Sequence, residues 1–310
     1  MIDTLNISYY HKEEPYLKAE LLSNLEKVTE VKYHDGECSY QSKYKDYSIT
    51  LGRSNLSLRG SIAKQFYGNN FQTITRPQLI ETIEDLSEHL NFDISECKVN
   101  RVDVATNYVM NHSPPVYFDS LGQDKYYTRQ PQWYSTVYWN QTKRKKLCYD
   151  KGQWAKDNGL QIPLEYKNLN IFRFENRLMS AFVVGEVMGK LKPQVKHLFE
   201  EETYKTLIDE WHKQWTNIHK TKKANFNLKS IMKQSEIEHL MIAGFVDTIG
   251  EEGYSNLLQR MKDFGVFKHP SQYTRFKNTI KDIRERNSID HNLLIEELEM
   301  KIGDVEDYYS

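Results

Sequence analysis

The sequence predicts an α+β fold, because strand-like segments dominate up to about residue 180 and helix-forming segments follow. In the first part, short runs rich in β-branched and aromatic residues alternate with turn signals. In the second part, apolar residues recur at helical spacing between glycines and prolines. A chain of 310 residues is long enough for two domains. We place them at residues 1–180, an α+β domain, and residues 181–310, an all-helical region.

Eight strands are expected in the first part, each a run in which β-branched or aromatic side chains recur. They cover residues 2–10, 28–34, 47–51, 56–59, 99–108, 134–140, 145–149 and 171–178. A helix interrupts them, since Thr75 is a suitable N-cap, Pro77 lies near the first turn and apolar residues recur at helical spacing up to Asn91. A short helix is expected after Pro115. In the second part, helices are expected at residues 198–218, 237–249, 254–264, 273–283 and 293–302.

The bulk composition excludes several classes of protein but selects no partner. Lys and Arg total 42 and Asp and Glu total 43, so the net charge of −1 gives no sign of a polyanionic ligand. The three cysteines are far apart and form no CxxC pair, which argues against a disulfide framework or a zinc ribbon. No segment forms a signal peptide or approaches the ~18 apolar residues of a membrane span. We therefore expect a soluble cytoplasmic protein with no membrane contact.

Positive charge is concentrated in residues 121–151. This span has a net charge of +5 and contains Lys125, Arg129, Lys143, Arg144, Lys145, Lys146 and Lys151 against Asp124 and Asp150. Its aromatic residues are Tyr126, Tyr127, Trp133, Tyr134, Tyr138 and Trp139. Cations that pair with phosphates, together with rings that stack on bases, are typical of a groove for single-stranded nucleic acid. A solvated hairpin whose lysines protect a sheet edge is an equally good interpretation of the composition.

Two of the expected strands carry an arginine, an acid and apolar neighbours in alternation. Because residues two apart share a face of a strand, Arg101 and Asp103 lie on one side of theirs. Arg173, Glu175 and Arg177 share a face in the same way. An acid inside a sheet is costly unless it is paired or binds metal. Ion pairs with the arginines and a divalent-metal site are both open.

The order of four motifs resembles a family of replication proteins. The motifs are Gly60, Ser61, Lys64, Gly68, Asn69 and Asn70, then RVDVATN at residues 101–107, LCYDK at 147–151 and FRFENR at 172–177. Together they are similar to phage and plasmid replication initiators of the filamentous-phage gene II/X type. They are more distantly similar to the rolling-circle initiators of staphylococcal plasmids. The resemblance covers roughly residues 50–180.

What the resemblance implies is a site-specific nickase that opens one strand of a replication origin in rolling-circle replication. Tyr149 would attack the phosphodiester, giving a 5′-phosphotyrosyl link and a free 3′-OH that primes synthesis. A phenol with a pKa near ~10 is a poor nucleophile at neutral pH unless cations or a metal stabilise its phenolate. Lys151 would share the face of Tyr149 if the strand continues, and would contact the phosphate. The resemblance makes Asp103 and Glu175 the ligands of Mg²⁺ or Mn²⁺.

The remaining predictions concern the partners. The residues expected to bind nucleic acid are Arg101, Lys143, Arg144, Lys145, Lys146, Arg173, Arg177 and Lys64. The partners are origin DNA and the nicked single strand, and for the helical region a host helicase or a second copy of the chain. The architecture that we expect is a catalytic domain on a curved antiparallel sheet with packed helices, followed by the all-helical region.

One departure from the pattern leaves another function open. Arg59 stands where many relatives have an acid just before Gly-Ser, so at most two acids remain for a metal. A noncatalytic DNA-binding regulator that has lost cleavage is therefore the alternative. An RNA-binding sheet is a third class, supported only by the number of aromatic residues and weakened by the absence of an RNP1-like run.

Overall fold

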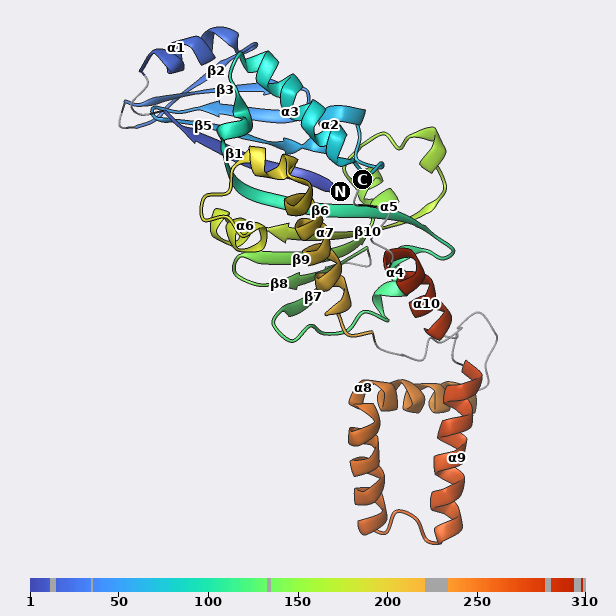
Figure 1. Ribbon diagram of the computed structural model, residues 1–310. Coiled ribbons are helices and arrows are strands. Elements are labelled where there is room, and N and C mark those ends of the chain that lie inside the picture. Colours follow the sequence, from blue (N-terminus) through green and yellow to red (C-terminus); the bar gives the residue numbers. More distant parts are fainter. Residues whose placement is uncertain are drawn as a thin grey trace. The chain divides into compact units, whose positions relative to one another are not determined.

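The computed structural model describes residues 1–11, 15–34, 36–132, 135–220, 234–287, 291–303 and 308. Its described strands form one antiparallel sheet in the order β2-β3-β4-β5-β1-β6-β10-β9-β8-β7 (Figure 1). The strands are β1 (Ile2–Tyr10), β2 (Thr29–Lys32), β3 (Cys38–Tyr44), β4 (Tyr47–Leu51), β5 (Asn55–Ser61), β6 (Lys98–Met110), β7 (Thr128–Gln132), β8 (Thr136–Asn140), β9 (Arg144–Asp150) and β10 (Asn170–Leu178). The expected α+β class and antiparallel sheet are confirmed, and β3 and β7 are strands that the sequence pattern did not predict.

The helices lie between the strands and after them. They are α1 (Pro15–Asn24), α2 (Ile62–Tyr67), α3 (Arg76–Leu90), η1 (Ile94–Glu96), α4 (Pro114–Phe118), α5 (Lys151–Asp157), η2 (Leu164–Tyr166), α6 (Ala181–Met188), η3 (Val195–Phe199), α7 (Glu201–Thr216), α8 (Gln234–Asp263), α9 (Pro270–Asn287) and α10 (His291–Ile302). The predicted start of α3 is confirmed, because Thr75 caps it in a capping box with Gln78. None of the described helices is both long and apolar enough to cross a membrane.

The chain divides into two compact units, which are described separately. The first comprises residues 1–118, 122–219 and 300–310, and the second comprises residues 119–121 and 220–299. The first unit thus extends past residue 180, where the sequence suggested a boundary. The reason is α7, whose Trp211 and Trp215 pack on Phe174 of β10 at 5.2 and 5.3 Å between ring centroids. The second unit has its own core around Val246, Tyr254, Leu258 and Ile280.

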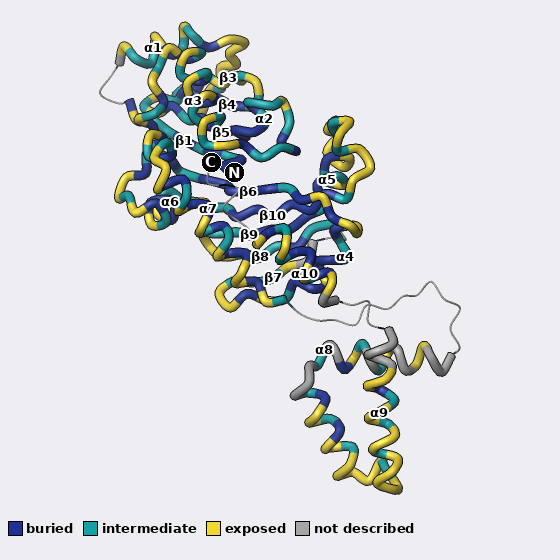
Figure 2. Tube along the Cα trace, turned by 45° about the vertical axis from the view of Figure 1, so that its right-hand side comes forward, coloured by how far each residue is buried: buried dark blue, intermediate teal, exposed yellow. Residues whose placement is uncertain are grey.

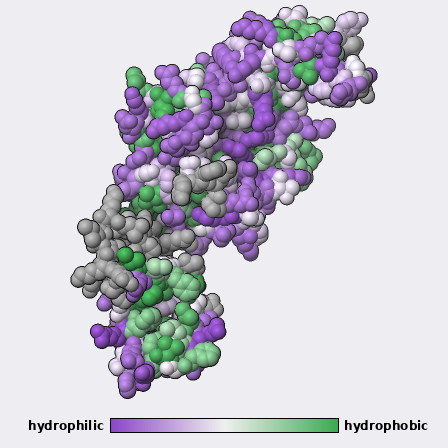
Figure 3. Space-filling model, turned by 180° about the vertical axis from the view of Figure 1, so that it is seen from behind, coloured by the Kyte–Doolittle hydropathy of each residue, from purple (hydrophilic) through white to green (hydrophobic). Residues whose placement is uncertain are grey.

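The sheet has two unlike faces. On the face covered by helices, side chains such as Val102, Val104, Phe172 and Phe174 are buried. Figure 2 colours much of β6 and β10 as buried. In Figure 1 the helices α3, α6 and α7 lie in front of the strands. The opposite face carries the polar residues of the same strands, and the view from behind in Figure 3 shows the body of this unit as largely hydrophilic. The candidate site lies on this polar face.

Candidate active site

Strands β6, β10 and β9 bring Asp103, Glu175 and Tyr149 together on the polar face. The register places Arg177 opposite Asp103 and Arg173 opposite Tyr149. All of these positions share a face, because directly paired residues in adjacent strands point the same way. The alternation expected for β6 and β10 is therefore observed. Three segments that are distant in sequence meet in one cluster.

Tyr149 contacts one of the two predicted acids. Its hydroxyl donates a hydrogen bond to Oε2 of Glu175 at 3.5 Å. The ring is buried, with 5% of the residue exposed, and it lies 6.0 Å from the ring of Trp154 in α5. The phenol thus lies at the acids but is covered from solvent.

Guanidinium groups pair with both acids. Arg101 donates to both oxygens of Asp103, through Nε at 2.7 Å and Nη2 at 2.5 Å. Nε of Arg177 lies 2.6 Å from Oε1 of Glu175 and 3.7 Å from Oδ2 of Asp103, so one cation lies between the two carboxylates. Arg173 contacts the other oxygen of Glu175 at 3.4 Å.

A third acid, Asp3, completes the cluster and was not predicted. Its Oδ2 lies 2.8 Å from Nη2 of the buried Arg173, and its Oδ1 accepts hydrogen bonds from Ser61 at 3.1 Å and Asn70 at 3.4 Å. Asn70 in turn accepts a hydrogen bond from Nζ of Lys151 at 2.5 Å. Asn70 thereby links the acid on β1 to the lysine that follows Tyr149.

Burial and neighbouring charges shift the acids in opposite directions. Burial raises the pKa of Asp103 to about 7, with Glu175 adding to the rise and Arg101 opposing it. Burial would also raise the pKa of Glu175, but the charges of Arg177 and Arg173 outweigh it and hold that pKa below its usual value. Glu175 is therefore ionised at neutral pH, whereas Asp103 titrates near it.

The two groups expected to react with DNA are also perturbed. Burial raises the pKa of Tyr149 far above its usual value, although Arg173 opposes the shift. Burial lowers the pKa of Lys151 to about 7, helped by Arg173 and opposed by Asp3. The phenol is thus fully protonated at neutral pH, and the lysine is poised to exchange a proton.

These carboxylates do not form a ready site for a divalent cation. Among the residues that the structure describes, no group of three or more His, Cys, Asp or Glu is placed to hold a metal. Both oxygens of Asp103 are engaged by Arg101, and Arg177 lies between the two acids where a bridging ion would lie. A metal ligated by Asp103 and Glu175 would first have to displace that guanidinium.

With this geometry established, comparison with known proteins identifies the family. Residues 1–189 match the family model for the N-terminal part of the phage replication-associated protein of the gene II type. The chain belongs to this family. None of the curated proteins matches the chain. The family match covers the whole cluster, from Asp3 to Arg177, and it supports a role in initiating phage DNA replication, with DNA as the partner.

Local structure explains several residues of the motifs in this gene II-type chain. Ser61 caps α2 by accepting from the backbone N–H of Lys64, and Gly60 is required because a Cβ there would lie 2.7 Å from the ring of Tyr47. Asp150 caps α5 by accepting from Gln153. The strand therefore ends at Asp150, so the condition under which Lys151 would share a strand face with Tyr149 is not met. Lys151 nevertheless reaches the cluster from the first position of the helix.

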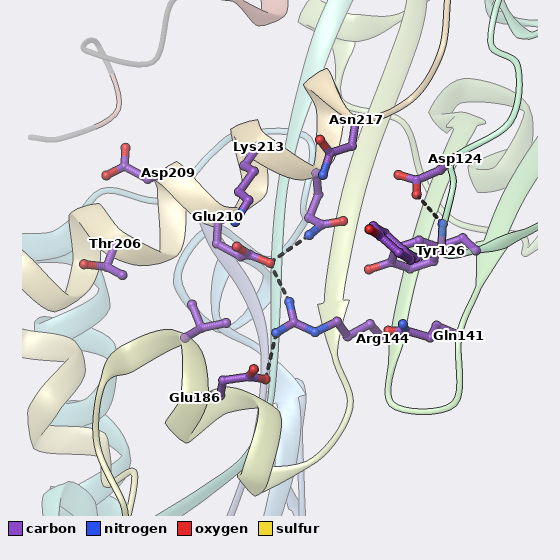
Figure 4. A pocket seen from close by; sticks show the side chains of 13 residues that line it. Asp124, Tyr126, Gln141, Arg144, Glu186, Thr206, Asp209, Glu210, Lys213 and Asn217 are labelled. Carbon is purple, nitrogen blue, oxygen red and sulfur yellow. Dashed lines mark hydrogen bonds and ion pairs between the residues drawn. The ribbon is translucent and has the colours of Figure 1, made fainter.

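Two residues of the basic run at residues 143–146, Arg144 and Lys146, point to the helix-covered face of the sheet. Nζ of Lys146 is buried and forms an ion pair with Asp124 and a hydrogen bond to the carbonyl of Gln214. Arg144 lies beside a hollow of about 560 Å³, where it pairs with Glu210 at 2.5 Å and Glu186 at 3.1 Å (Figure 4). The strand period separates these two cations from Tyr149, so the structure does not bring the four-residue basic run together.

The other residues predicted to bind nucleic acid lie in three places. Arg101, Arg173, Arg177 and Lys145 are on the polar face, and Lys145 lies opposite Arg177. Lys143 is exposed in the turn before β9, with its ammonium over the ring of Phe182. Lys64 of α2 lies 3.6 Å from Asp46.

The aromatic residues of the basic segment serve different purposes. Trp139 is buried and donates to the carbonyl of Gly122, and the ring of Tyr127 covers the ammonium of Lys146. Tyr126 is exposed. Trp133 and Tyr134, which the sequence also suggested, lie outside the described residues.

Proposed function

We propose that the protein initiates replication by nicking one strand of origin DNA, with Tyr149 as the nucleophile. The observation that carries this proposal is the contact between the Tyr149 hydroxyl and Glu175 inside a cluster of three acids and several cations. Membership of the replication-associated protein family supports it independently. The product would be a 5′-phosphotyrosyl protein and a free 3′-OH.

The chemistry needs a base, because the Tyr149 phenol is protonated at neutral pH. Glu175 is ionised and already accepts the phenolic hydrogen bond, so it would take the proton as the phenolic oxygen bonds to phosphorus. The bond from phosphorus to the 3′-oxygen breaks in the same displacement. The protonated form of Lys151 would supply a proton to that oxygen, leaving the 3′-OH.

Charge on the phosphate would be stabilised by guanidinium groups. Arg177 and Arg101 are the partly exposed cations of the cluster, at 26% and 15% of their side chains. They would meet the nonbridging oxygens, where negative charge gathers in the transition state. The Mg²⁺ or Mn²⁺ predicted from the resemblance is a separate proposal, which requires Arg177 to move.

The noncatalytic regulator remains the second candidate, and one observation favours it. Tyr149 is covered on the side of α5, so no phosphate reaches its hydroxyl without a movement of the protein. A protein of this kind would bind origin DNA without cleaving it. Contacts of the helical region with a host helicase or a second copy of the chain also remain predictions.

Trapping a covalent adduct distinguishes the two candidates. The protein is incubated with single-stranded oligonucleotides that have a randomised core, with Mn²⁺ or with EDTA, and is then denatured and run on a gel. We expect a DNA-linked band that disappears in Tyr149→Phe and persists in Tyr138→Phe, a matched control on the same face. An equal band in Tyr149→Phe would refute the assignment of the nucleophile, and no band from the parent protein would favour the regulator.

A further inference from the structure

We propose that the polar face of the sheet from β6 to β3 is a binding track for the single-stranded DNA that flanks the nick. This inference rests on the proposed function and extends its site to residues that the family motifs do not include. The track is a cross-strand row made of Arg101, Asn6, Arg59, Ser48 and Lys43, which we call the cationic row.

The row is continuous in the register of the sheet. Arg101 pairs with Asn6, Asn6 with Arg59, Arg59 with Ser48, and Ser48 with Lys43. Directly paired side chains point to the same face. Since neighbouring strands lie about 4.8 Å apart, successive cations are about 10 Å apart across one intervening strand. A line of charge thus leads from the Tyr149 cluster across four further strands.

The outer cations of the row are free to bind. Arg59 and Lys43 are exposed, and neither has an ion-pair partner among the described residues. Between them and Arg101, Oδ1 of Asn6 is shielded from solvent and has no hydrogen-bond partner among the described residues. By contrast, the cations nearest Tyr149 are paired with acids. The row therefore offers unneutralised charge that the fold itself does not use.

Beyond Asp3, the described strand residues that point to this part of the face include no acid. In β1, β5, β4 and β3 they are Thr4, Asn6, Ser8, Tyr10, Asn55, Ser57, Arg59, Ser61, Ser48, Thr50, Ser39, Gln41 and Lys43. Solvent-facing strands usually mix both signs of charge. The hydroxyl, amide and cationic groups of these strand residues, in a protein of net charge −1, match a phosphodiester chain. The nearby Asp46, in the turn before β4, is engaged by the backbone N–H of Ser61 and by Lys64.

The face ends in a place where a base can stack. Tyr10 is 65% exposed and lies with Tyr33 beside a hollow of about 800 Å³, which is also lined by Asn55 and by the ion pair of Arg53 with Glu37. Aromatic side chains on a positively charged groove hold unpaired bases without regard to sequence. These features favour single-stranded DNA, whose bases are free to turn toward the sheet.

The track also gives Arg59 a role. The resemblance implies an acid at this position that would contact a metal, so the arginine stands for a lost metal ligand in that interpretation. Arg59 is two residues from Ser61 and therefore points to the same face, one row further from Tyr149. It extends the phosphate contacts of Arg101 and Arg177 rather than replacing a ligand.

Fluorescence anisotropy with oligothymidylate tests the track without cleavage. Tyr149→Phe serves as the background, and its affinity for strands of 6 and 30 nucleotides is compared with that of the same protein carrying Arg59→Ala and Lys43→Ala. We expect about tenfold weaker binding of the 30-mer and a salt slope lower by ~1.4, since each phosphate contact contributes ~0.7 on a single strand. Binding of the 6-mer should change little. A variant carrying Arg59→Lys should retain most of the affinity.

The control removes two exposed cations from elsewhere in the same unit, by Lys192→Ala and Lys213→Ala. Lys213 belongs to α7, on the helix-covered side of the sheet. Equal loss in this control, or unchanged binding in the track variant, would overturn the track. The nickase is tested separately by the covalent adduct. An adduct that depends on Tyr149 together with an unaffected track variant would refute the track alone, and an adduct that persists in Tyr149→Phe would refute the nucleophile alone.

Discussion

Asp3→Asn should destabilise the first unit more than any surface change, because it removes the carboxylate that pairs with the buried guanidinium of Arg173. Arg173 is 2% exposed, and Asp3 lies 2.8 Å from its Nη2. Removing one partner of a buried ion pair typically costs about 3–5 kcal/mol. Glu175 remains 3.4 Å from Nε of Arg173, so we expect about 3 kcal/mol. For a unit of this size that corresponds to a fall in Tm of roughly 6–12 °C, measured by circular dichroism.

A double-mutant cycle gives the decisive comparison. Arg173→Met should also destabilise the protein, because it leaves Asp3 buried without its cation. The combination with Asp3→Asn should cost clearly less than the sum of the single variants, with a coupling of about 2 kcal/mol. Additive effects, or a Tm within about 1 °C of the parent in Asp3→Asn, would refute the role given to this pair.

Three further predictions concern protonation and metal. Burial raises the pKa of Asp103 to about 7, so the stability that this group contributes is full below pH ~4 and is lost as the pH rises toward 7. In urea titrations, the unfolding free energy of the parent relative to Asp103→Asn should therefore fall over that range. A difference that does not change with pH would contradict the raised pKa. Lys151 should give an alkaline limb near pH ~7 in the single-turnover rate of nicking, which Lys151→Arg should remove; identical profiles would exclude the lysine as the proton donor. Without DNA, electron paramagnetic resonance should find Mn²⁺ bound equally by the parent and by the variant with Asp103→Asn and Glu175→Gln, whereas loss of binding in that variant would support the metal site.

The shared face of the arginines and acids could be predicted because strand geometry is periodic, whereas Tyr149 was proposed from the resemblance. Alternation alone placed Asp103 on the face of Arg101, and Glu175 between Arg173 and Arg177, and the register then brought the strands together. The same period explains why the four cations of residues 143–146 do not form one basic surface. Counting charge along a segment ignores that alternate residues of a strand point to opposite faces.

Two parts of the cluster could not be read from local pattern. Asp3 lies at a shift in the register between β1 and β6, which falls between Ile2 and Thr4, so simple alternation does not give its direction. Asn70 lies outside the strands and meets Asp3 and Lys151 only through the tertiary fold. Long-range contacts of this kind leave no periodic signal in the sequence.

The pairing of Arg177 suggests how DNA binding and activation of Tyr149 are coupled. Arg177 is partly exposed and pairs with the buried Glu175, and its charge does most to keep the pKa of Glu175 low. A phosphate arriving along the polar face would compete for its guanidinium and leave Glu175 a stronger base beside the phenol. Arg177→Gln should therefore weaken DNA binding and raise the pKa of the acid limb of the nicking rate, measured as kcat/KM against pH. An acid limb that stays at the parental pH would separate phosphate binding from base strength and refute the coupling.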